Sequence, residues 1–322
     1  MNLIIVIQLL MLCVGLYFVI KGADVLLSSA TALGKTLKVS DFFIGLIVIG
    51  FGTSLAELLV SLKAVLEGSP NLSFGNVIGS NISNIILVLG FALLISNLQF
   101  KNLKKFDIFF HLTIHLSFFI IFYFLIFNST YGFIFIIIFS FYIIKSFKDS
   151  SSSEINSIEL DKDIFSTLSF TNPLKYGVPI IFLSIIFTLF GAQITVNSAI
   201  KISKILNISE SFLGLSIIAI GTSLPEIATS VRAAKRKKVD IVIGNIIGSN
   251  IYNLLLILGA SSLFDNFNYN KSLLTFEVIF LIVCVLILSL LLSINFNFKK
   301  KHSFIFIFLY LSYLYNLFKT NF

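Results

Sequence analysis

The sequence predicts an all-α membrane protein with ten transmembrane helices, arranged as two inverted repeats of five helices each. Its composition, the alternation of its basic loops and an internal duplication lead to this prediction. Hydrophobic residues make up 57% of the 322 residues and charged residues only 12%, with a mean hydropathy of +1.02. A soluble domain carries about 25% charged residues. Because too little polar surface remains to face water, we expect the chain to lie in a membrane. We therefore interpret the net charge of +8 as a signal of membrane topology rather than as a nucleic-acid site.

Ten segments have the length and apolar character of a spanning helix, which needs about 20 residues. They lie at residues 3–33, 42–67, 73–96, 106–127, 131–147, 174–204, 211–234, 240–263, 273–295 and 303–318. With this count, the basic residues separate by side. The loops after helices 1, 3, 5, 7 and 9 hold 18 of the 23 Lys and Arg, Lys21 included, and the opposite side holds 5. Because Lys and Arg collect in cytoplasmic loops, we expect a multi-pass protein of the cell membrane with both termini outside.

The chain contains an internal duplication. Residues 42–90 and 211–259 align without gaps at a constant offset of 169, and 22 of these 49 positions are identical. Each half has an odd number of helices, so the second half enters the membrane from the opposite face. Many secondary transporters have such inverted repeats. The predicted division is residues 1–147 for the first repeat, 148–172 for a cytoplasmic linker and 173–322 for the second repeat.

Two acidic residues, Glu57 and Glu226, lie well inside apolar segments and are equivalent in the repeats. An ionisable group there costs ~2.5–3.5 kcal/mol on insertion scales, so a symmetric pair indicates function. Each follows a Gly-Thr-Ser sequence that weakens a helix, and we expect carbonyls near Gly50 and Ala219 to be freed. The hydroxyls that share a helix face with these acids are those of Thr53, Ser54, Thr222 and Ser223.

The helix after each glutamate carries a polar stripe with spacing i, i+4, i+8. Its members are Asn76, Ser80 and Asn84 in one half, and Asn245, Ser249 and Asn253 in the other. Together with the carboxylates these residues form an all-oxygen set, which suits hard cations such as Ca²⁺ and disfavours Zn²⁺ and copper. Hydrogen bonds between helices are the alternative for the Ser and Asn residues.

Other polar and small residues are expected to have structural roles. The G-x-x-x-G pairs Gly75/Gly79 and Gly244/Gly248 predict close helix packing. His111 and His115, which have no equivalent in the second half, are expected to serve packing.

The two blocks resemble the alpha repeats of the cation/calcium antiporter superfamily, whose best-known members exchange sodium for calcium. The paired motifs G-T-S-L-x-E and G-N-x-I-G-S-N in inverted halves carry the resemblance. In that family the two repeat glutamates bind the transported ions, helped by neighbouring hydroxyls, backbone carbonyls and polar residues of the following helix. The resemblance therefore implies the ligands Glu57, Thr53, Ser54, Ser80, Asn84, Glu226, Thr222, Ser223, Ser249 and Asn253, with the carbonyls of Gly50 and Ala219.

The sequence departs from the family pattern at two positions. Ala56 stands where the family usually has Pro, so we expect a weaker first helix break. Asn253 stands where several members, notably potassium-dependent ones, have Asp, so we expect no potassium requirement.

The predicted function is antiport of Na⁺ against Ca²⁺ through an all-oxygen site at the bilayer midplane. Its partners would be inorganic cations and the lipid bilayer, with no nucleic acid, cofactor or obligatory protein partner. An H⁺-coupled antiporter of Ca²⁺ or another divalent cation is the alternative. A cation channel also stays open, although nothing resembles a symmetric selectivity filter. The sequence lacks H-E-x-x-H, and its few His residues are not near the glutamates, so an enzyme is not expected.

Overall fold

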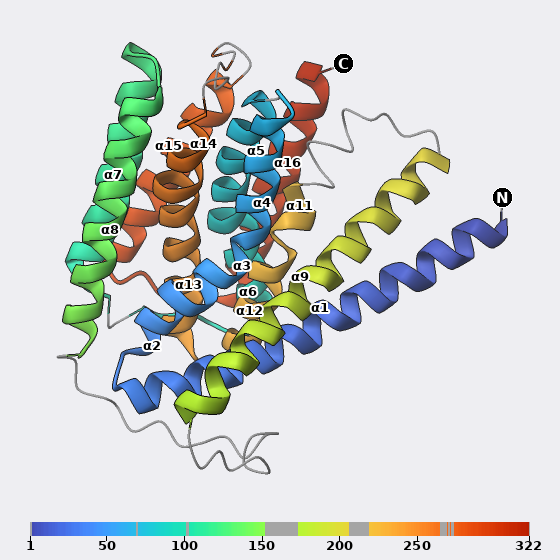
Figure 1. The fold of residues 1–322 in the computed structure, drawn as a ribbon, viewed down its shortest axis with the longest axis horizontal. Helices are drawn as coiled ribbons and strands as arrows, with labels where there is room; N and C mark the ends of the chain where they lie inside the picture. The colour runs from blue at the N-terminus through green and yellow to red at the C-terminus, as the bar shows by residue number, and fades with distance from the viewer. Residues whose placement is uncertain are drawn as a thin grey trace.

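The computed structural model describes residues 2–68, 70–100, 103–151, 173–205, 219–264, 269, 271 and 274–321. Within these ranges the regular structure is helical, apart from one antiparallel bridge between Leu98 and Phe298 (Figure 1). The prediction of an all-α membrane protein is confirmed for this part of the chain. The predicted linker at 148–172 overlaps the last residues of helix α8 (Ser129–Ser151), and its remainder lies outside the described residues.

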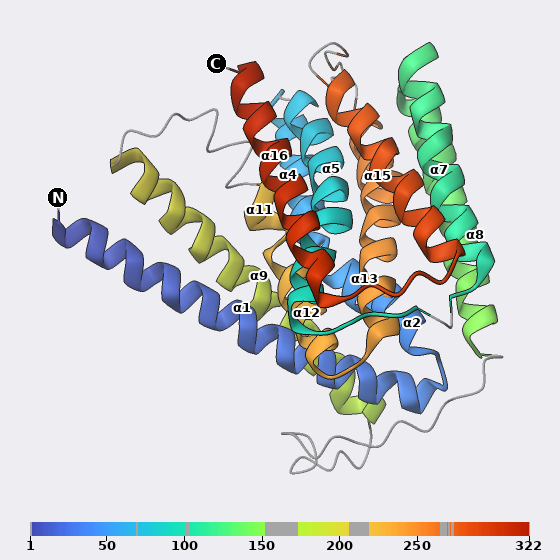
Figure 2. The ribbon, with the colours of Figure 1, turned by 180° about the vertical axis from the view of Figure 1, so that it is seen from behind.

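Two long helices, α1 (Asn2–Leu37) and α9 (Pro173–Ile205), lie side by side and cross the other helices obliquely (Figures 1 and 2). Their backbones touch, because a Cβ atom added at Gly191 would lie 2.7 Å from the carbonyl oxygen of Gly15. Lys21, predicted to belong to a loop, lies inside α1.

The remaining helices form a bundle. It contains α2 (Asp41–Phe43), η1 (Ile44–Ile49), α3 (Gly50–Thr53), α4 (Leu55–Leu66), α5 (Pro70–Ser83), η2 (Asn84–Val88), α6 (Leu89–Ile95), α7 (Lys105–Phe124), α8, α11 (Ala219–Thr222), α12 (Leu224–Lys235), α13 (Val239–Ile251), η4 (Tyr252–Leu258), α14 (Gly259–Ser261), α15 (Thr275–Ser293), η6 (Lys300–His302) and α16 (Ser303–Asn321). Every predicted span contains a helix, although the seventh is described only from residue 219. Seven helices among the described residues are long and apolar enough to cross a membrane, or eight if a bent pair at 41–66 counts as one span.

The loops meet in two groups, one at each end of the bundle. The loops that follow odd-numbered predicted spans, together with the last residues of those spans, contact one another. These contacts are Ser96 Oγ to the Ala234 carbonyl (3.2 Å), Leu98 N to the Phe298 carbonyl (2.8 Å), Lys104 Nζ to the Asp149 carbonyl (2.6 Å) and Lys238 Nζ to Asp41 Oδ2 (3.7 Å). Between the loops after the fourth and eighth spans, Phe127 N donates to Tyr269 Oη at 3.0 Å. The basic loops therefore gather at one end, as the alternation of charge requires.

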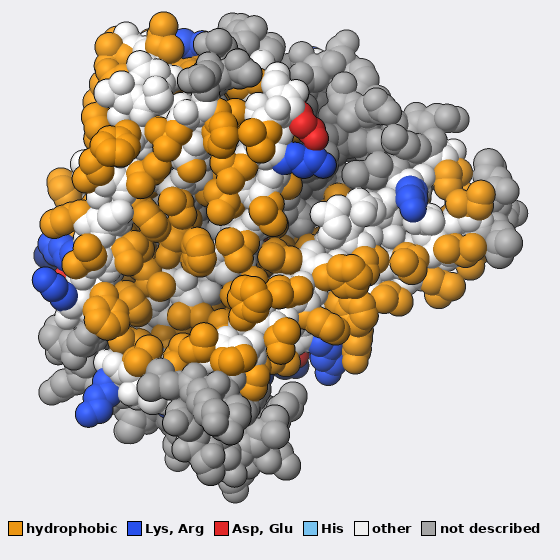
Figure 3. Space-filling view, in the orientation of Figure 1, with side chains coloured by type: hydrophobic (Ala, Val, Ile, Leu, Met, Phe, Trp, Pro, Cys, Tyr) orange, Lys and Arg blue, Asp and Glu red, His pale blue; other side chains and the backbone are white. Residues whose placement is uncertain are grey.

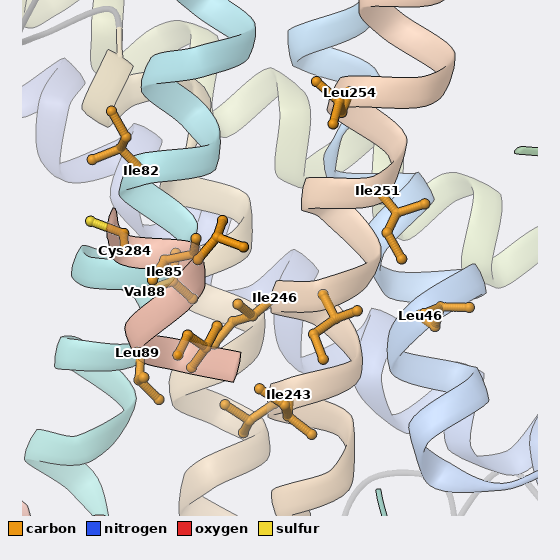
Figure 4. Packing of buried hydrophobic residues seen from close by; sticks show 14 of the residues in the cluster. Leu46, Ile82, Ile85, Val88, Leu89, Ile243, Ile246, Ile251, Leu254 and Cys284 are labelled. Carbon is orange, nitrogen blue, oxygen red and sulfur yellow. The ribbon is translucent and has the colours of Figure 1, made fainter. Parts of the chain in front are cut away.

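The motif helices, α5–η2 and α13–η4, are among the most deeply buried parts of the bundle (Figure 4). In that figure, η2 contributes Ile85 and Val88, and α13 contributes Ile243 and Ile246. Helix α13 also crosses η1 at close range, since a Cβ added at Gly248 would lie 2.6 Å from the carbonyl oxygen of Leu46.

This contact confirms close packing for one of the two predicted G-x-x-x-G pairs. A Cβ added at Gly244 would lie 2.3 Å from the Phe42 carbonyl oxygen. At both positions of the second pair, the close approach is therefore possible only because glycine has no side chain. At Gly75 the nearest described atom would be 3.9 Å away, and at Gly79 none of the described atoms would lie within 4 Å. The first pair therefore shows no comparable contact within the described part of the chain.

An ion pair ties α1 to the end of α12. Asp24 Oδ2 lies 2.7 Å from Arg232 Nη2, and Asp24 Oδ1 lies 3.7 Å from Arg236 Nη2. Arg236 Nη1 also donates to Ser28 Oγ at 2.7 Å. The side chains of the acid and the two arginines are 13%, 23% and 18% exposed, so these charges are largely removed from solvent.

The contacts described for the mirror positions in the other repeat are local. Gln193, the equivalent of Asp24, donates to Asn197 of its own helix at 2.9 Å. Lys63 and Glu67, the equivalents of the two arginines, lie 3.7 Å apart in an exposed pair at positions i and i+4. Among the described residues, the ion pair between α1 and α12 therefore has no counterpart at the opposite end.

The outer surface is apolar. Hydrophobic side chains cover most of the described face shown in Figure 3, and the few charged side chains in that view are scattered among them. Large apolar side chains such as Leu10 (62% exposed) and Phe304 (70% exposed) point outward. Such a surface fits lipid contact and is too apolar for a soluble monomer.

Candidate ion-binding site

Both glutamate-bearing helices are broken at the serine of the G-T-S motif. Ser54 has φ −73° and ψ 2°, and Ser223 has φ −83° and ψ 0°. The first break bends the chain by 41°. The two serines have nearly the same backbone angles, and the weaker break beside Ala56 stays a prediction because the residues just before Ala219 lie outside the described part of the chain. Pro225 occupies the first turn of α12, where its missing N–H is not needed, so the break does not depend on it.

Glu57 and Glu226 lie in the first turns of α4 and α12, and both are almost completely buried (0% and 1% exposed). A carboxylate is favoured there by the partial positive charge of a helix N-terminus. The two carboxylates are near enough for their charges to interact. Ser54 Oγ, from the first repeat, donates to Glu226 Oε1 of the second at 3.4 Å. The structure thus brings the two acids of the inverted halves together.

The motif helix α13 reaches the same place from the second repeat. Ser249 Oγ donates to the Gly50 carbonyl at 3.4 Å. That carbonyl also accepts the helical bond from Ser54 N at 3.1 Å, so it is not freed by the break as predicted. Thr53 Oγ1 lies 3.3 Å from the same oxygen, so three donors of the protein already contact the Gly50 carbonyl. Ala219, the mirror position of Gly50, begins α11.

Many polar atoms of the predicted ligands have no hydrogen-bond partner. Of the 20 such buried atoms among the described residues, nine belong to this set. They are Glu57 Oε1 and Oε2, Ser80 Oγ, Asn84 Oδ1 and Nδ2, Ser223 Oγ, Glu226 Oε2, and Asn253 Oδ1 and Nδ2. Buried polar groups are normally paired, so this concentration needs an explanation. Seven of the nine are oxygens, which fits a cation as their missing partner.

The two threonines of the motifs are also buried, at 1% and 7% exposure for Thr53 and Thr222. Thr53 Oγ1 donates to the Ile49 carbonyl at 3.0 Å, which leaves its lone pairs available. The described residues contain no group of three or more His, Cys, Asp or Glu that could hold a metal ion. A site here therefore needs hydroxyl, amide or carbonyl oxygens in addition to the two carboxylates.

The first asparagine of each stripe has a different role from the other members. Asn76 Nδ2 donates to the backbone carbonyl of Glu57 at 3.3 Å and to Ser61 Oγ at 3.0 Å. Asn245 makes the same two contacts with the mirror residues, at 3.3 and 2.9 Å. These amides hold each motif helix against the glutamate-bearing helix. The presence of asparagine at both mirror positions could have indicated a shared role. Spacing alone, however, placed the two asparagines in one stripe with the predicted ligands.

The third residue of each stripe, Asn84 or Asn253, lies in a short π-helical segment, η2 or η4. A π-helical turn inside an α-helix is rare and is found frequently at functional sites. The inverted halves therefore match in their helix breaks, amide contacts and π-helical turns.

The chain is similar to known proteins in both sequence and structure. The model of the family "Sodium/calcium exchanger protein" matches residues 7–148 and 176–319. An uncharacterized membrane protein of Methanocaldococcus jannaschii is 36% identical over 256 residues, which are 78% of this chain and 80% of that protein. The sodium/calcium exchanger MaX1 of Methanosarcina acetivorans is 30% identical over 297 residues, 81% of this chain and 84% of the relative.

Solved structures of the sodium-calcium exchanger NCX_Mj share the fold. The structure soaked with 2.5 mM Na⁺ and 10 mM Sr²⁺ superposes with a TM-score of 0.80 at 29% identity, covering 95% of this chain and 97% of that chain. The structure soaked with 2.5 mM Na⁺ and 0.1 mM Ca²⁺ gives 0.78 at 30% identity, with 95% and 96% covered. The family match, these relatives and the paired motifs show that the chain belongs to the sodium/calcium exchanger family of membrane cation antiporters.

Proposed function

We propose that this protein exchanges Na⁺ for Ca²⁺ across the membrane, through a site at the bilayer midplane between two inverted repeats of five spanning helices. The meeting of Glu57 and Glu226, each from one repeat and each with an unpaired oxygen, is the observation that supports this proposal most directly. The ligand set would be that implied by the family resemblance. The basic loops would face the cytoplasm and both termini the outside.

The charge of the site explains exchange without leak. With both carboxylates ionised, the empty site has a formal charge of about −2, and enclosing it away from water is very unfavourable. One Ca²⁺ or several Na⁺ neutralise this charge. Loaded forms can therefore pass between the outward-open and inward-open states, whereas the empty form cannot. The downhill entry of Na⁺ would then drive Ca²⁺ out through the same oxygens.

The test is calcium-45 uptake into proteoliposomes under an imposed sodium gradient. We expect uptake that depends on the gradient, and its loss in Glu57→Gln and in Glu226→Gln, which keep side-chain size but remove the charge. Glu67→Gln is the matched control, because Glu67 lies just after α4 and is 65% exposed. Uptake that ignores sodium, or that survives both substitutions in the buried pair, would refute the proposal.

The same experiment separates the H⁺-coupled alternative. A carboxylate pair can bind protons in place of Na⁺, so a pH gradient is imposed in a parallel arm without sodium. Calcium uptake driven by that gradient alone would assign H⁺ coupling. Steady conduction without a counter-ion would assign a channel. We propose no enzymatic activity, cofactor, nucleic acid or obligatory protein partner.

A further inference from the structure

A second buried polar cluster lies beside the candidate site, and the proposed function does not use it. It consists of His111 and His115 of α7, Asn81 of α5 and Asn250 of α13. All four side chains are at most 1% exposed. Asn81 and Asn250 are equivalent in the two repeats, and each directly follows a predicted ligand serine.

The hydrogen bonds determine which atom donates. His115 Nδ1 lies 2.7 Å from the carbonyl oxygen of His111, which can only accept, so Nδ1 carries the proton. Nε2 of the neutral ring therefore accepts, and Asn81 Nδ2 donates to it at 3.3 Å. Asn81 Nδ2 also donates to the Asn250 backbone carbonyl at 3.3 Å. This second bond fixes the orientation of the Asn81 amide, since a flipped amide would place two oxygens against each other.

The other histidine completes the connection. Asn250 Nδ2 lies 3.4 Å from His111 Nε2, so this amide and this ring share a hydrogen bond whose direction depends on the tautomer of His111. The two imidazole rings are adjacent, with centroids 4.4 Å apart. Helix α7 thus holds one amide from each inverted repeat, and the two amide-bearing helices are also bonded directly to each other.

We propose that His111 and His115 are positioning residues for ion binding, which they serve by fixing the rotation of α5 and α13. Neighbouring residues on a helix are separated by about 100° of rotation. A rotation that releases Asn81 or Asn250 would therefore also turn the adjacent Ser80 or Ser249 away from the site. This inference rests on the proposed function, because it assumes that these serines bind the transported ion.

The mirror positions argue against a role in packing alone. The equivalents of His111 and His115 on α15 are Phe280 and Cys284, and Figure 4 shows Cys284 among apolar side chains of α5 and η2. In the described contacts of the second repeat, Phe280 stacks against Tyr313 and Cys284 lies among apolar side chains. The histidines add two hydrogen-bonding ring nitrogens that meet the amides, which packing does not require.

The experiment compares His115→Phe with His115→Gln. Phenylalanine fills the space and removes the acceptor, whereas the glutamine Oε1 can replace Nε2. Phe118→Leu is the control, because Phe118 is a buried residue of the same helix whose ring packs against Phe74, outside the hydrogen-bonded cluster. The readouts are the apparent KM for Ca²⁺ in proteoliposome uptake and the rise in Tm that Ca²⁺ causes in detergent.

We expect His115→Phe to raise the KM at least fivefold and to reduce the Ca²⁺-induced rise in Tm, with His115→Gln close to wild type. Phe118→Leu should lower the basal Tm without changing either readout. A wild-type KM in His115→Phe, or equal impairment in Phe and Gln variants, would overturn the inference. If His115→Phe does not fold, His111→Phe and His111→Gln repeat the comparison. A wild-type protein that shows the rise in Tm but no sodium-driven uptake would refute the proposed function, while the Tm readout would still decide the role of the histidines.

Discussion

Replacing Gly248 with alanine should weaken ion binding without touching a predicted ligand. The added Cβ would lie 2.6, 2.8 and 3.1 Å from the carbonyl oxygen, Cα and carbonyl carbon of Leu46. Ordinary van der Waals contact begins at 3.4 Å, so the shortest distance falls 0.8 Å short (3.4 minus 2.6). All three atoms belong to the backbone, so no side chain can rotate away. Helix α13 must therefore move from η1 by a similar distance.

The size of the effect follows from that displacement. Overpacking of a well-packed interior costs about 1–3 kcal/mol. Ser249 comes next in the chain, and its hydroxyl bonds the Gly50 carbonyl at 3.4 Å, already near the limit for a hydrogen bond. Moving α13 outward separates these two predicted ligands. If the full cost falls on the ion-loaded state, the Ca²⁺ affinity drops by a factor between about 5 and about 140, at 1.4 kcal/mol per factor of ten.

The assay is calcium-45 uptake at a series of Ca²⁺ concentrations, with Tm measured on the same preparation. Gly75→Ala is the control, because Gly75 belongs to the G-x-x-x-G pair of the other repeat and its added Cβ would come no closer than 3.9 Å to a described atom. We expect a raised KM and lower Tm for Gly248→Ala and nearly wild-type values for Gly75→Ala. A Gly248→Ala variant with unchanged KM and Tm would show that the backbones are not in contact.

Three further predictions follow from the described contacts. Asp24→Asn removes the carboxylate that pairs with Arg232. It should lower the unfolding free energy by about 1–3 kcal/mol, which lies between the values for exposed and for buried ion pairs. An unchanged Tm in Asp24→Asn would contradict this prediction. Ser54→Ala removes the donor to Glu226 and should raise the KM for Ca²⁺ several-fold in the uptake assay, whereas an unaltered KM would exclude a role in binding. Chelation of Ca²⁺ should lower the unfolding free energy of the wild type by about 2.7 kcal/mol, relative to protein in Ca²⁺ at 100 times its Kd. In Glu57→Gln, calorimetry should find little difference between the chelated and the Ca²⁺-containing samples.

The helices could be predicted from sequence because an apolar run of about 20 residues has few other stable conformations in a bilayer. Every predicted span contains a helix in the described residues, and the meeting of Glu57 and Glu226 was expected from the duplication. The count of ten membrane-crossing helices and the domain boundaries stay predictions. Hydropathy identifies the helices, but not the depth at which each one lies in the bilayer.

The contacts between helices were harder to predict. Spacing places a residue on one face of a helix, but it does not say which helix packs against that face. Asn76 shares a stripe with Ser80 and Asn84, yet it contacts the backbone of the neighbouring helix α4. The partners of His111 and His115 come from both repeats, and no local pattern around the histidines predicts them. The difference between Ala56 and Pro225 suggested that the two helix breaks would have different backbone angles. Ser54 and Ser223 nevertheless have nearly the same angles.

The differences between the repeats bear on the transport cycle. If two inverted halves were identical, exchanging their conformations would produce outward-open and inward-open states of equal energy. Here the Asp24–Arg232 pair links α1 to α12 at the end where the basic loops gather, and its mirror residues Gln193 and Lys63 cannot form an ion pair. Separating α1 from α12 at that end breaks a partly buried pair, and no equivalent pair forms at the other end in compensation. The asymmetry therefore favours the state in which α1 and α12 remain in contact, and the free energy that separating the pair costs in one half of a cycle is recovered when the pair forms again.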